Sequence, residues 1–190
     1  MKIIYLHGLA SVGTGPKTEA LVKTFGDRSV IFPDLPLSPK KTIKLVDDIL
    51  HGRDDRFIFV GTSLGGFWAN YFAHKYACSR AVLINPLTNP VESFMDRVGS
   101  VVKNYVTAEE TLFTQEILDE FWMAENLLAS KLNPKLLDVF LAKDDDVIDY
   151  QHTLKALHGA RSTTVLGTGG HRFEEPWPKV VKFIRKLVDD

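Results

Sequence analysis

A serine framed by two glycines is the residue in this sequence with the clearest capacity for chemistry. The run Gly-Thr-Ser-Leu-Gly at residues 61–65 follows the apolar segment Phe57–Val60, which predicts a buried strand, and precedes an aromatic-rich stretch that predicts a helix. A strand, a sharp turn and a helix with Gly-x-Ser-x-Gly at the turn are typical of a nucleophile elbow. So tight a turn brings the backbone close on both sides, and Gly61 and Gly65 fit where a Cβ atom would clash. We therefore expect Ser63 to present its hydroxyl at the end of the strand.

Serine becomes a nucleophile only when a base removes its proton, and the base needs an acid that fixes its tautomer. His171 stands in a glycine-rich loop after the last predicted strand, which favours it as the base. His7 closes the first strand and is assigned to loop structure, and the other four histidines fall within or at the ends of predicted helices: His51, His74, His152 and His158. Three consecutive aspartates at 144–146 follow the preceding strand, and composition offers no choice among them. The chain order serine, aspartate, histidine is that of α/β-hydrolases.

Strands and helices alternate along the chain, which predicts a mostly parallel sheet of about six strands with helices on both faces. In such sheets the active site lies beyond the carboxyl ends of the strands. The serine, the three aspartates and the histidine all directly follow predicted strands, so we expect them to meet at one edge. The predicted strands cover residues 2–6, 29–32, 57–60, 81–84, 136–141 and 163–166.

The oxyanion of an acyl-transfer intermediate needs two backbone N–H donors. Leu64, directly after the serine, supplies one candidate N–H. The loop after the first strand should supply the second if the first and third strands are neighbours, and Leu9 is the candidate there.

Residues 87–133 interrupt the alternation, because they contain no strand pattern. We expect a short helix around Val91–Val98 and a longer one from about residue 114 to 130. We interpret 87–133 as a helical cap segment that covers the carboxyl ends of the strands and shapes the acyl pocket. Phe121 and Trp122 are adjacent on the longer helix and face about 100° apart, so we expect one of them to line that pocket.

Length and composition indicate one α/β domain over residues 1–190. The net charge of −1 gives no electrostatic basis for binding nucleic acid or an acidic membrane surface. Cys78 is the only cysteine, which excludes a disulfide within the chain, and we expect a packed structural thiol there. No segment approaches a membrane span and the sequence enters a strand without a signal-peptide pattern, which predicts a cytoplasmic protein.

Five motifs spread along nearly the whole chain resemble the YqiA/YcfP family of small α/β-hydrolases: Ile3–Gly8, Val60–Phe67, Val82–Pro86, Asp145–Tyr150 and Gly169–Phe173. The resemblance implies a compact, mostly parallel α/β-hydrolase fold with esterase activity on short acyl esters, and activity on acyl thioesters in some members. The family pattern places one residue between the catalytic acid and Val147, which selects Asp145.

We therefore predict a serine esterase whose partner is a small-molecule acyl ester. Ser63 attacks the acyl carbonyl, His171 passes the serine proton to the leaving alcohol, and Asp145 orients His171. No metal or organic cofactor is required for this chemistry. Two alternatives stay open: a thioesterase with the same triad, and a protein that binds ligands on this scaffold without turnover.

Overall fold

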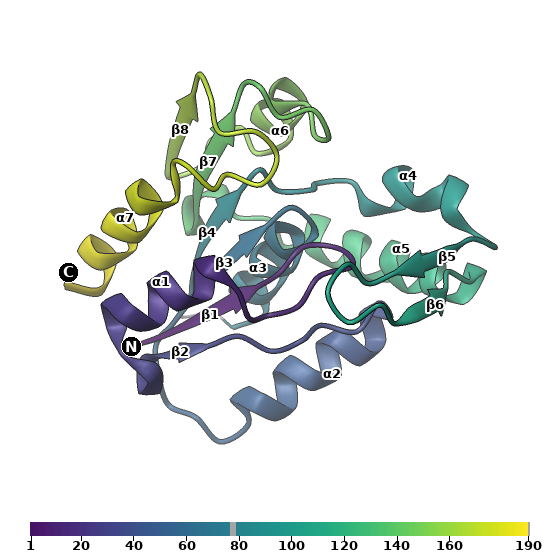
Figure 1. Cartoon of the computed structure of the whole chain (residues 1–190), viewed down its shortest axis with the longest axis horizontal. Coiled ribbons are helices and arrows are strands. Elements are labelled where there is room, and N and C mark those ends of the chain that lie inside the picture. The colour runs from purple at the N-terminus through teal and green to yellow at the C-terminus, as the bar shows by residue number, and fades with distance from the viewer. Residues whose placement is uncertain (77–78, 190) are drawn as a thin grey trace.

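Six parallel strands form the central sheet of the protein, in the order β2-β1-β3-β4-β7-β8 (Figure 1). The computed structural model describes residues 1–76 and 79–189, so Cys78 and the thiol role predicted for it lie outside the described residues. The sheet confirms the predicted α/β class. Its strands are Lys2–Leu6 (β1), Val30–Ile31 (β2), Phe57–Thr62 (β3), Arg80–Ile84 (β4), Leu137–Ala142 (β7) and Ser162–Leu166 (β8).

Helices cover both faces of this sheet because the side chains of its central strands alternate between two hydrophobic clusters. Ile4 and Leu6 of β1 join one cluster, whereas Ile3 and Tyr5 join the other. The first cluster includes residues of α2 (Pro39–Leu50) and α3 (Leu64–Lys75), and the second includes residues of α1 (Pro16–Phe25) and α7 (Trp177–Asp189). The short helix α6 (Tyr150–Ala156) lies beside β7, and 3₁₀ turns occupy Asp27–Ser29, Met95–Arg97 and Pro134–Leu136.

The register of the strands brings their carboxyl ends to one edge. Leu6 at the end of β1 pairs with Gly61 near the end of β3, and Thr62 pairs with Ile84 at the end of β4. Ala142 at the end of β7 pairs with Leu166 at the end of β8. The loops that carry the candidate residues of the sequence analysis therefore emerge from the same edge of the sheet.

Residues 87–133 contain the two predicted helices and also a β-hairpin. The short helix α4 (Pro90–Phe94) runs into a 3₁₀ turn, and the longer helix α5 spans Gln115–Ala129. Between them β5 (Val101–Lys103) pairs antiparallel with β6 (Glu110–Leu112). The expectation that this segment lacks strands is therefore wrong. Each strand is only three residues long and its outward side chains are exposed, so no buried-strand pattern marks it.

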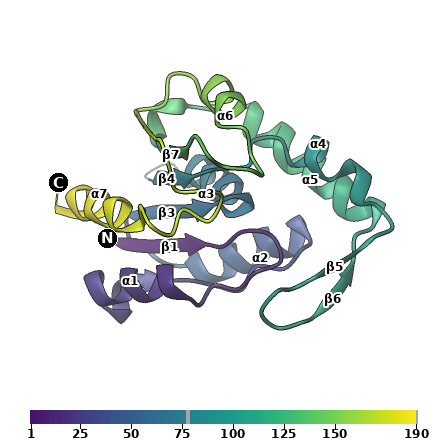
Figure 2. The ribbon, with the colours of Figure 1, turned by 45° about the horizontal axis from the view of Figure 1, so that its top comes forward.

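This inserted segment lies beyond the carboxyl ends of the strands, on the side of the molecule opposite the two termini (Figure 2). The carboxylate of Glu120 on α5 holds it to the body by accepting hydrogen bonds from Ser38 Oγ (2.6 Å) and from the backbone N–H of Lys40 (3.0 Å) at the start of α2. Among the described residues, no helix is long and apolar enough to cross a membrane.

Candidate active site

Ser63 occupies a strained turn between β3 and α3, with φ 58° and ψ −124°. A Cβ atom added at Gly61 would lie 1.9 Å from the carbonyl oxygen of Gly65, and one added at Gly65 would lie 1.9 Å from that of Leu6. Both distances are far inside van der Waals contact, so only glycine fits at either position. The predicted strand, turn and helix are confirmed.

The hydroxyl of Ser63, the ring of His171 and the carboxylate of Asp145 form a continuous chain of hydrogen bonds. Ser63 Oγ lies 3.1 Å from His171 Nε2, and His171 Nδ1 lies 3.0 Å from each carboxylate oxygen of Asp145. An ionised carboxylate only accepts hydrogen bonds, so Nδ1 carries the proton and Nε2 is left to accept from the serine. That tautomer is the one a serine nucleophile requires.

Hydrogen bonds from His171 and from the backbone hold the carboxylate of Asp145 in place. Its side chain is 1% exposed, and besides facing His171 it accepts backbone N–H bonds from Val147 and Ile148, each 2.9 Å from Oδ1. Burial opposes ionisation of this carboxyl, but the hydrogen bonds from His171 and the two amides outweigh it and hold its pKa below the ordinary value. The group is therefore charged where a neighbouring imidazolium needs stabilisation.

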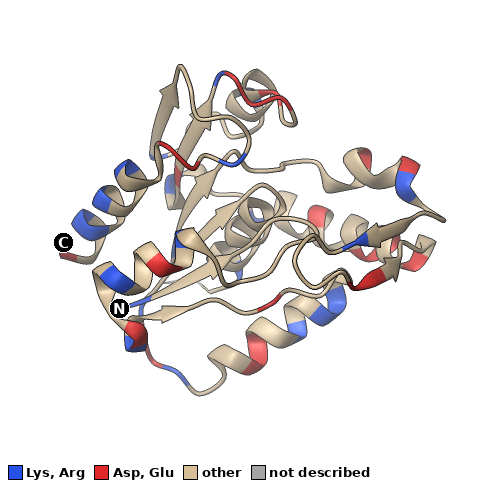
Figure 3. Ribbon diagram, in the orientation of Figure 1, with Lys and Arg blue, Asp and Glu red and all other residues tan. Residues whose placement is uncertain are grey.

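Acidic residues gather in the loop after β7 (Figure 3), and the two neighbours of Asp145 in this loop have different surroundings. Asp144 accepts backbone N–H bonds from Gly170 (2.8 Å) and Gly169 (3.2 Å), the two residues that precede His171. Asp144 is exposed to water, yet its carboxylate binds the backbone of the loop that carries His171. Asp146 is exposed, and its side chain makes no hydrogen bond within the described part of the chain.

The loop after β1 lies directly against the nucleophile. A Cβ atom added at Gly8 would be 3.4 Å from Ser63 Cβ and 3.9 Å from Ser63 Oγ. Leu9 and Leu64, the two candidates for the oxyanion donors, both line the cavity that opens beside Ser63. The structure therefore brings these backbone segments together, as strand neighbours β1 and β3 require.

His7 is buried and structural, as the sequence analysis assigned it. Its Nε2 accepts the backbone N–H of Leu35 (2.7 Å), and its Nδ1 donates to the carbonyl of Gly8 (2.8 Å). Burial lowers the pKa of His7, which keeps the ring neutral in these roles. The ring joins the loops after β1 and β2, the two loops that form one wall of the cavity.

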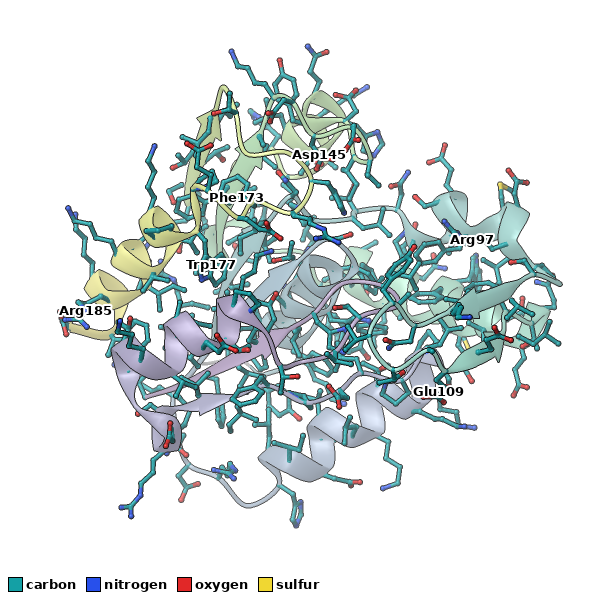
Figure 4. All side chains as sticks on the ribbon, in the orientation of Figure 1. Arg97, Glu109, Asp145, Phe173, Trp177 and Arg185 are labelled. Atoms are coloured by element: carbon teal, nitrogen blue, oxygen red, sulfur yellow. The ribbon has the colours of Figure 1, made fainter. Side chains whose placement is uncertain are left out.

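The cavity beside Ser63 has a volume of about 290 Å³ and lies between these two loops, the start of α3 and the inserted segment. Its buried apolar wall comes from Leu64, Trp68, Val102 and Ile117, and its rim is polar. Glu109, which belongs to this rim, lies on the hairpin between β5 and β6 (Figure 4).

Phe121 and Trp122 do not line this cavity, so the prediction that one of them does is wrong. Phe121 is fully buried, and its ring packs against those of Phe67, Trp68, Phe94 and Phe113. The side chain of Trp122 is 59% exposed on the outer face of α5. Ile117, one helical turn before Phe121 on the same stripe, reaches the cavity instead, and the stripe itself could have indicated it.

The sequence profile of Uncharacterised protein family UPF0227 matches residues 2–186. This chain belongs to UPF0227. The family resemblance predicted from the five motifs is thereby confirmed. A UPF0227 protein of Pectobacterium atrosepticum is 29% identical over 164 residues, 82% of this chain and 81% of its own. A UPF0227 protein of Yersinia pseudotuberculosis is 27% identical over 183 residues, 93% of each chain.

Solved structures similar to this UPF0227 chain share its fold. A putative hydrolase from Agrobacterium vitis has a TM-score of 0.71 at 19% identity, covering 98% of this chain and 87% of its own. The monoacylglycerol lipase of Paleococcus ferrophilus has a TM-score of 0.69 at 12% identity, covering 95% and 92%. These similarities confirm the α/β-hydrolase fold, and at such low identity they concern the fold alone.

Proposed function

We propose that this UPF0227 chain is a serine hydrolase that cleaves carboxylic esters with short acyl groups. The observation that carries the proposal is the hydrogen-bonded series from Ser63 Oγ through His171 to the buried carboxylate of Asp145, at 3.1 and 3.0 Å. The shared fold with a monoacylglycerol lipase supports the same class of chemistry.

The reaction follows from this arrangement in two halves. His171 Nε2 removes the hydroxyl proton as Ser63 Oγ attacks the acyl carbonyl, and the resulting imidazolium is stabilised by Asp145. The N–H groups of Leu9 and Leu64 bind the oxyanion. His171 then protonates the leaving alcohol, an acyl-enzyme ester forms on Ser63, and a water molecule activated by the same histidine releases the acid and restores the serine.

The size of the cavity supports a short acyl group. Its volume of about 290 Å³ is at the lower limit of the range common for ligand pockets, about 300–1,000 Å³. Trp68, Val102 and Ile117 form an apolar wall around it, which suits the carbon chain of an acyl group.

A panel of esters and thioesters of increasing acyl length tests the proposal, with Ser63→Ala as the matched inactive variant. We expect hydrolysis of two- to four-carbon acyl esters, loss of kcat by a factor on the order of 10³ or more in Ser63→Ala, and covalent labelling of Ser63 by a fluorophosphonate. Faster cleavage of thioesters than of the matched esters would reassign the leaving group. No turnover of either class, with no labelling of Ser63, would favour a binding protein on this scaffold.

A further inference from the structure

The base His171 stands in a loop that has little stiffness of its own. Gly169 and Gly170 precede it with φ of 150° and 56°, conformations that glycine adopts freely, and the loop lies at the surface. Catalysis nevertheless requires the imidazole to be held within about 0.5 Å of its productive position. Other parts of the chain must therefore supply that rigidity.

Asn85, directly after β4, binds both the loop that carries the base and the strand that carries the acid. Its Nδ2 donates to the carbonyl of Gly170 (2.9 Å) and to that of His171 (3.2 Å). Its Oδ1 accepts the backbone N–H of Ala142 (2.9 Å) at the end of β7, three residues before Asp145. Both amide hydrogens and the amide oxygen are thus used within one buried side chain.

The same short segment also holds the nucleophile. The backbone N–H of Ser63 donates to the carbonyl of Ile84, and the backbone N–H of Leu87 donates to the carbonyl of Ser63, both at 3.0 Å. Asn85 lies between these two contacts. Residues 84–87 therefore contact the backbone of the nucleophile, the strand before the acid and the loop of the base.

The burial and backbone conformation of Asn85 explain why this residue type is present. The residue is 1% exposed, so its hydrogen bonds form away from water, where they are stronger and where an unpaired partner costs more. Its φ is 41°, in the left-handed region that asparagine and aspartate tolerate better than other side chains. Asparagine combines this tolerance with two N–H donors and an acceptor on one amide group.

The loop that carries His171 also has an exposed polar contact and two apolar contacts. Asp144 binds the amides of Gly169 and Gly170, but it is exposed to water. Phe173 and Trp177 bury their rings after the histidine, where they anchor the far end of the loop to the core (Figure 4). Asn85, by contrast, makes a buried polar contact with the backbone carbonyl of the histidine itself.

We infer that Asn85 is a positioning residue, which sets the distance from His171 to Ser63 and Asp145 by tying the base loop to the ends of β4 and β7. The inference rests on the proposed function, because it assigns His171 as the base. Asn85 touches neither substrate nor the reacting atoms, and it acts through the loop.

Asn85→Asp is the sharpest test because the two side chains have the same shape and tolerate the same φ. The variant keeps the acceptor for Ala142 but replaces the donor for the two carbonyls with a carboxylate oxygen. We expect the rate of Ser63 labelling by a fluorophosphonate, and kcat for a short ester, to fall about 100-fold, because a displacement near 1 Å of a catalytic group costs about that much. KM should change less than about threefold, since neither Asn85 nor the base loop lines the cavity.

Asn70→Asp is the matched control. Asn70 is buried to a similar degree, 6% exposed on α3, and makes no contact with the base loop in the described residues. It should lose stability from the buried charge while keeping labelling of Ser63 at close to the parental rate. Asn85→Gly, which removes the side chain and suits the positive φ, repeats the test if Asn85→Asp does not fold.

The outcomes separate this inference from the proposed function. If the parent protein is not labelled at Ser63, the hydrolase proposal itself fails. If the parent is labelled and a folded Asn85 variant reacts at the parental rate, the positioning role is overturned while the hydrolase proposal stands. If both Asn85 variants fail to fold, Asn85 is a folding determinant and the positioning role is likewise overturned.

Discussion

The carboxylate of Asp144 lies 2.8 Å from the backbone nitrogen of Gly170, the residue that directly precedes His171. Asp145, the next residue in the chain, binds the imidazole of His171 at 3.0 Å. Two adjacent carboxylates thus share one loop but have different partners. Asp144 binds the backbone of the loop, and Asp145 binds the ring of His171.

This division predicts a graded response to removing each negative charge. Asp145→Asn should lower kcat on the order of 10⁴-fold, because the amide no longer selects the tautomer that presents Nε2 to Ser63. Asp144→Asn should lower kcat about tenfold, since one oxygen still accepts from the loop while the new NH₂ faces the second amide. Steady-state kinetics on a short ester measure both.

Asp146→Asn is the matched control for these two variants. It makes the same chemical change on an exposed side chain, so kcat should stay within about twofold of the parent. A loss in Asp144→Asn equal to that in Asp145→Asn would show that Asp144 is part of the catalytic acid. Equal activity in the Asp144 and Asp146 variants would show that the contact with Gly170 is not needed.

The sheet and the elbow are predictable from sequence because they depend on local steric rules. The strand before Ser63 and the glycines around it allow only a sharp turn with a positive φ, whatever the rest of the chain does. The hairpin of β5 and β6 follows no such rule. Val101 and Leu112 face each other across it, but they are exposed, so neither alternation nor burial marks these strands in the sequence.

The residues of the cavity wall were not predicted from the sequence, for a related reason. Val102 reaches the cavity only because the unpredicted hairpin carries it there, and Trp68 only because α3 turns its face toward that hairpin. Trp122 has the size and chemistry of a pocket residue, but its place on the outer face of α5 depends on how that helix packs. Residue type and spacing do not contain that information, whereas they did predict that Ser63 and His171 meet at one edge of the sheet.

Ile117 offers a test of which side of α5 faces the substrate. Ile117→Ala should shift the preference toward acyl groups two or more carbons longer, because it enlarges the apolar wall, and should lower the free energy of unfolding by about 2 kcal/mol. Trp122→Ala should leave the preference unchanged and cost less than about 1 kcal/mol, since its side chain is mostly in water. The acyl-length preference and the urea unfolding of both variants are the measurements. A shift of preference in Trp122→Ala alone would show that the Trp122 side of α5 faces the substrate.

Lys17, near the start of α1, binds the backbone of the loop that carries His171. Its Nζ donates to the carbonyl of Arg172, one residue after the base, and lies 5.5 Å from the centre of the Trp177 ring. Burial, offset only in part by the charge of Glu174, lowers the pKa of Lys17 from 10.5 to about 8. The unfolded chain therefore binds more protons than the folded chain between about pH 8 and 10.5.

This difference predicts that the Lys17 side chain makes stability rise with pH in that window. The cost of burying its ammonium is fully present below about pH 8 and decreases as the pH rises to about 10.5, where the unfolded chain also loses this proton. The free energy of unfolding, measured with urea at pH 7 and at pH 9.5, should increase more with pH for the parent than for Lys17→Met, because methionine has no charge to lose. If the free energy of unfolding changes equally with pH in both proteins, Lys17 does not titrate in this range.

The hairpin of β5 and β6 is hydrogen-bonded to the loop that carries Leu9, the proposed oxyanion donor. The backbone N–H of Tyr105 donates to the carbonyl of Ala10 (2.9 Å), and Asn104 Nδ2 donates to the carbonyl of Ser11 (2.8 Å). The Oδ1 of Asn104 meanwhile accepts two amides of the hairpin turn, at 2.9 and 3.0 Å. One side chain thus shapes the hairpin tip and binds it to the loop beside the nucleophile.

Asn104→Asp separates these two roles, because a carboxylate still accepts the turn amides but cannot donate to Ser11. The hairpin should keep its shape while the loop of Leu9 loses its support, so kcat for a short ester should fall between about tenfold and 100-fold, less than the loss expected from deleting an oxyanion donor outright. Asn126→Asp on α5, whose Nδ2 donates to the carbonyl of Trp122 in its own helix, makes the same chemical change away from the loop of Leu9 and should keep parental kcat. Labelling of Ser63 by a fluorophosphonate should slow in parallel with kcat, because its phosphoryl oxygen uses the same donors. Parental rates in a folded Asn104→Asp protein would show that the loop of Leu9 holds its position without the hairpin.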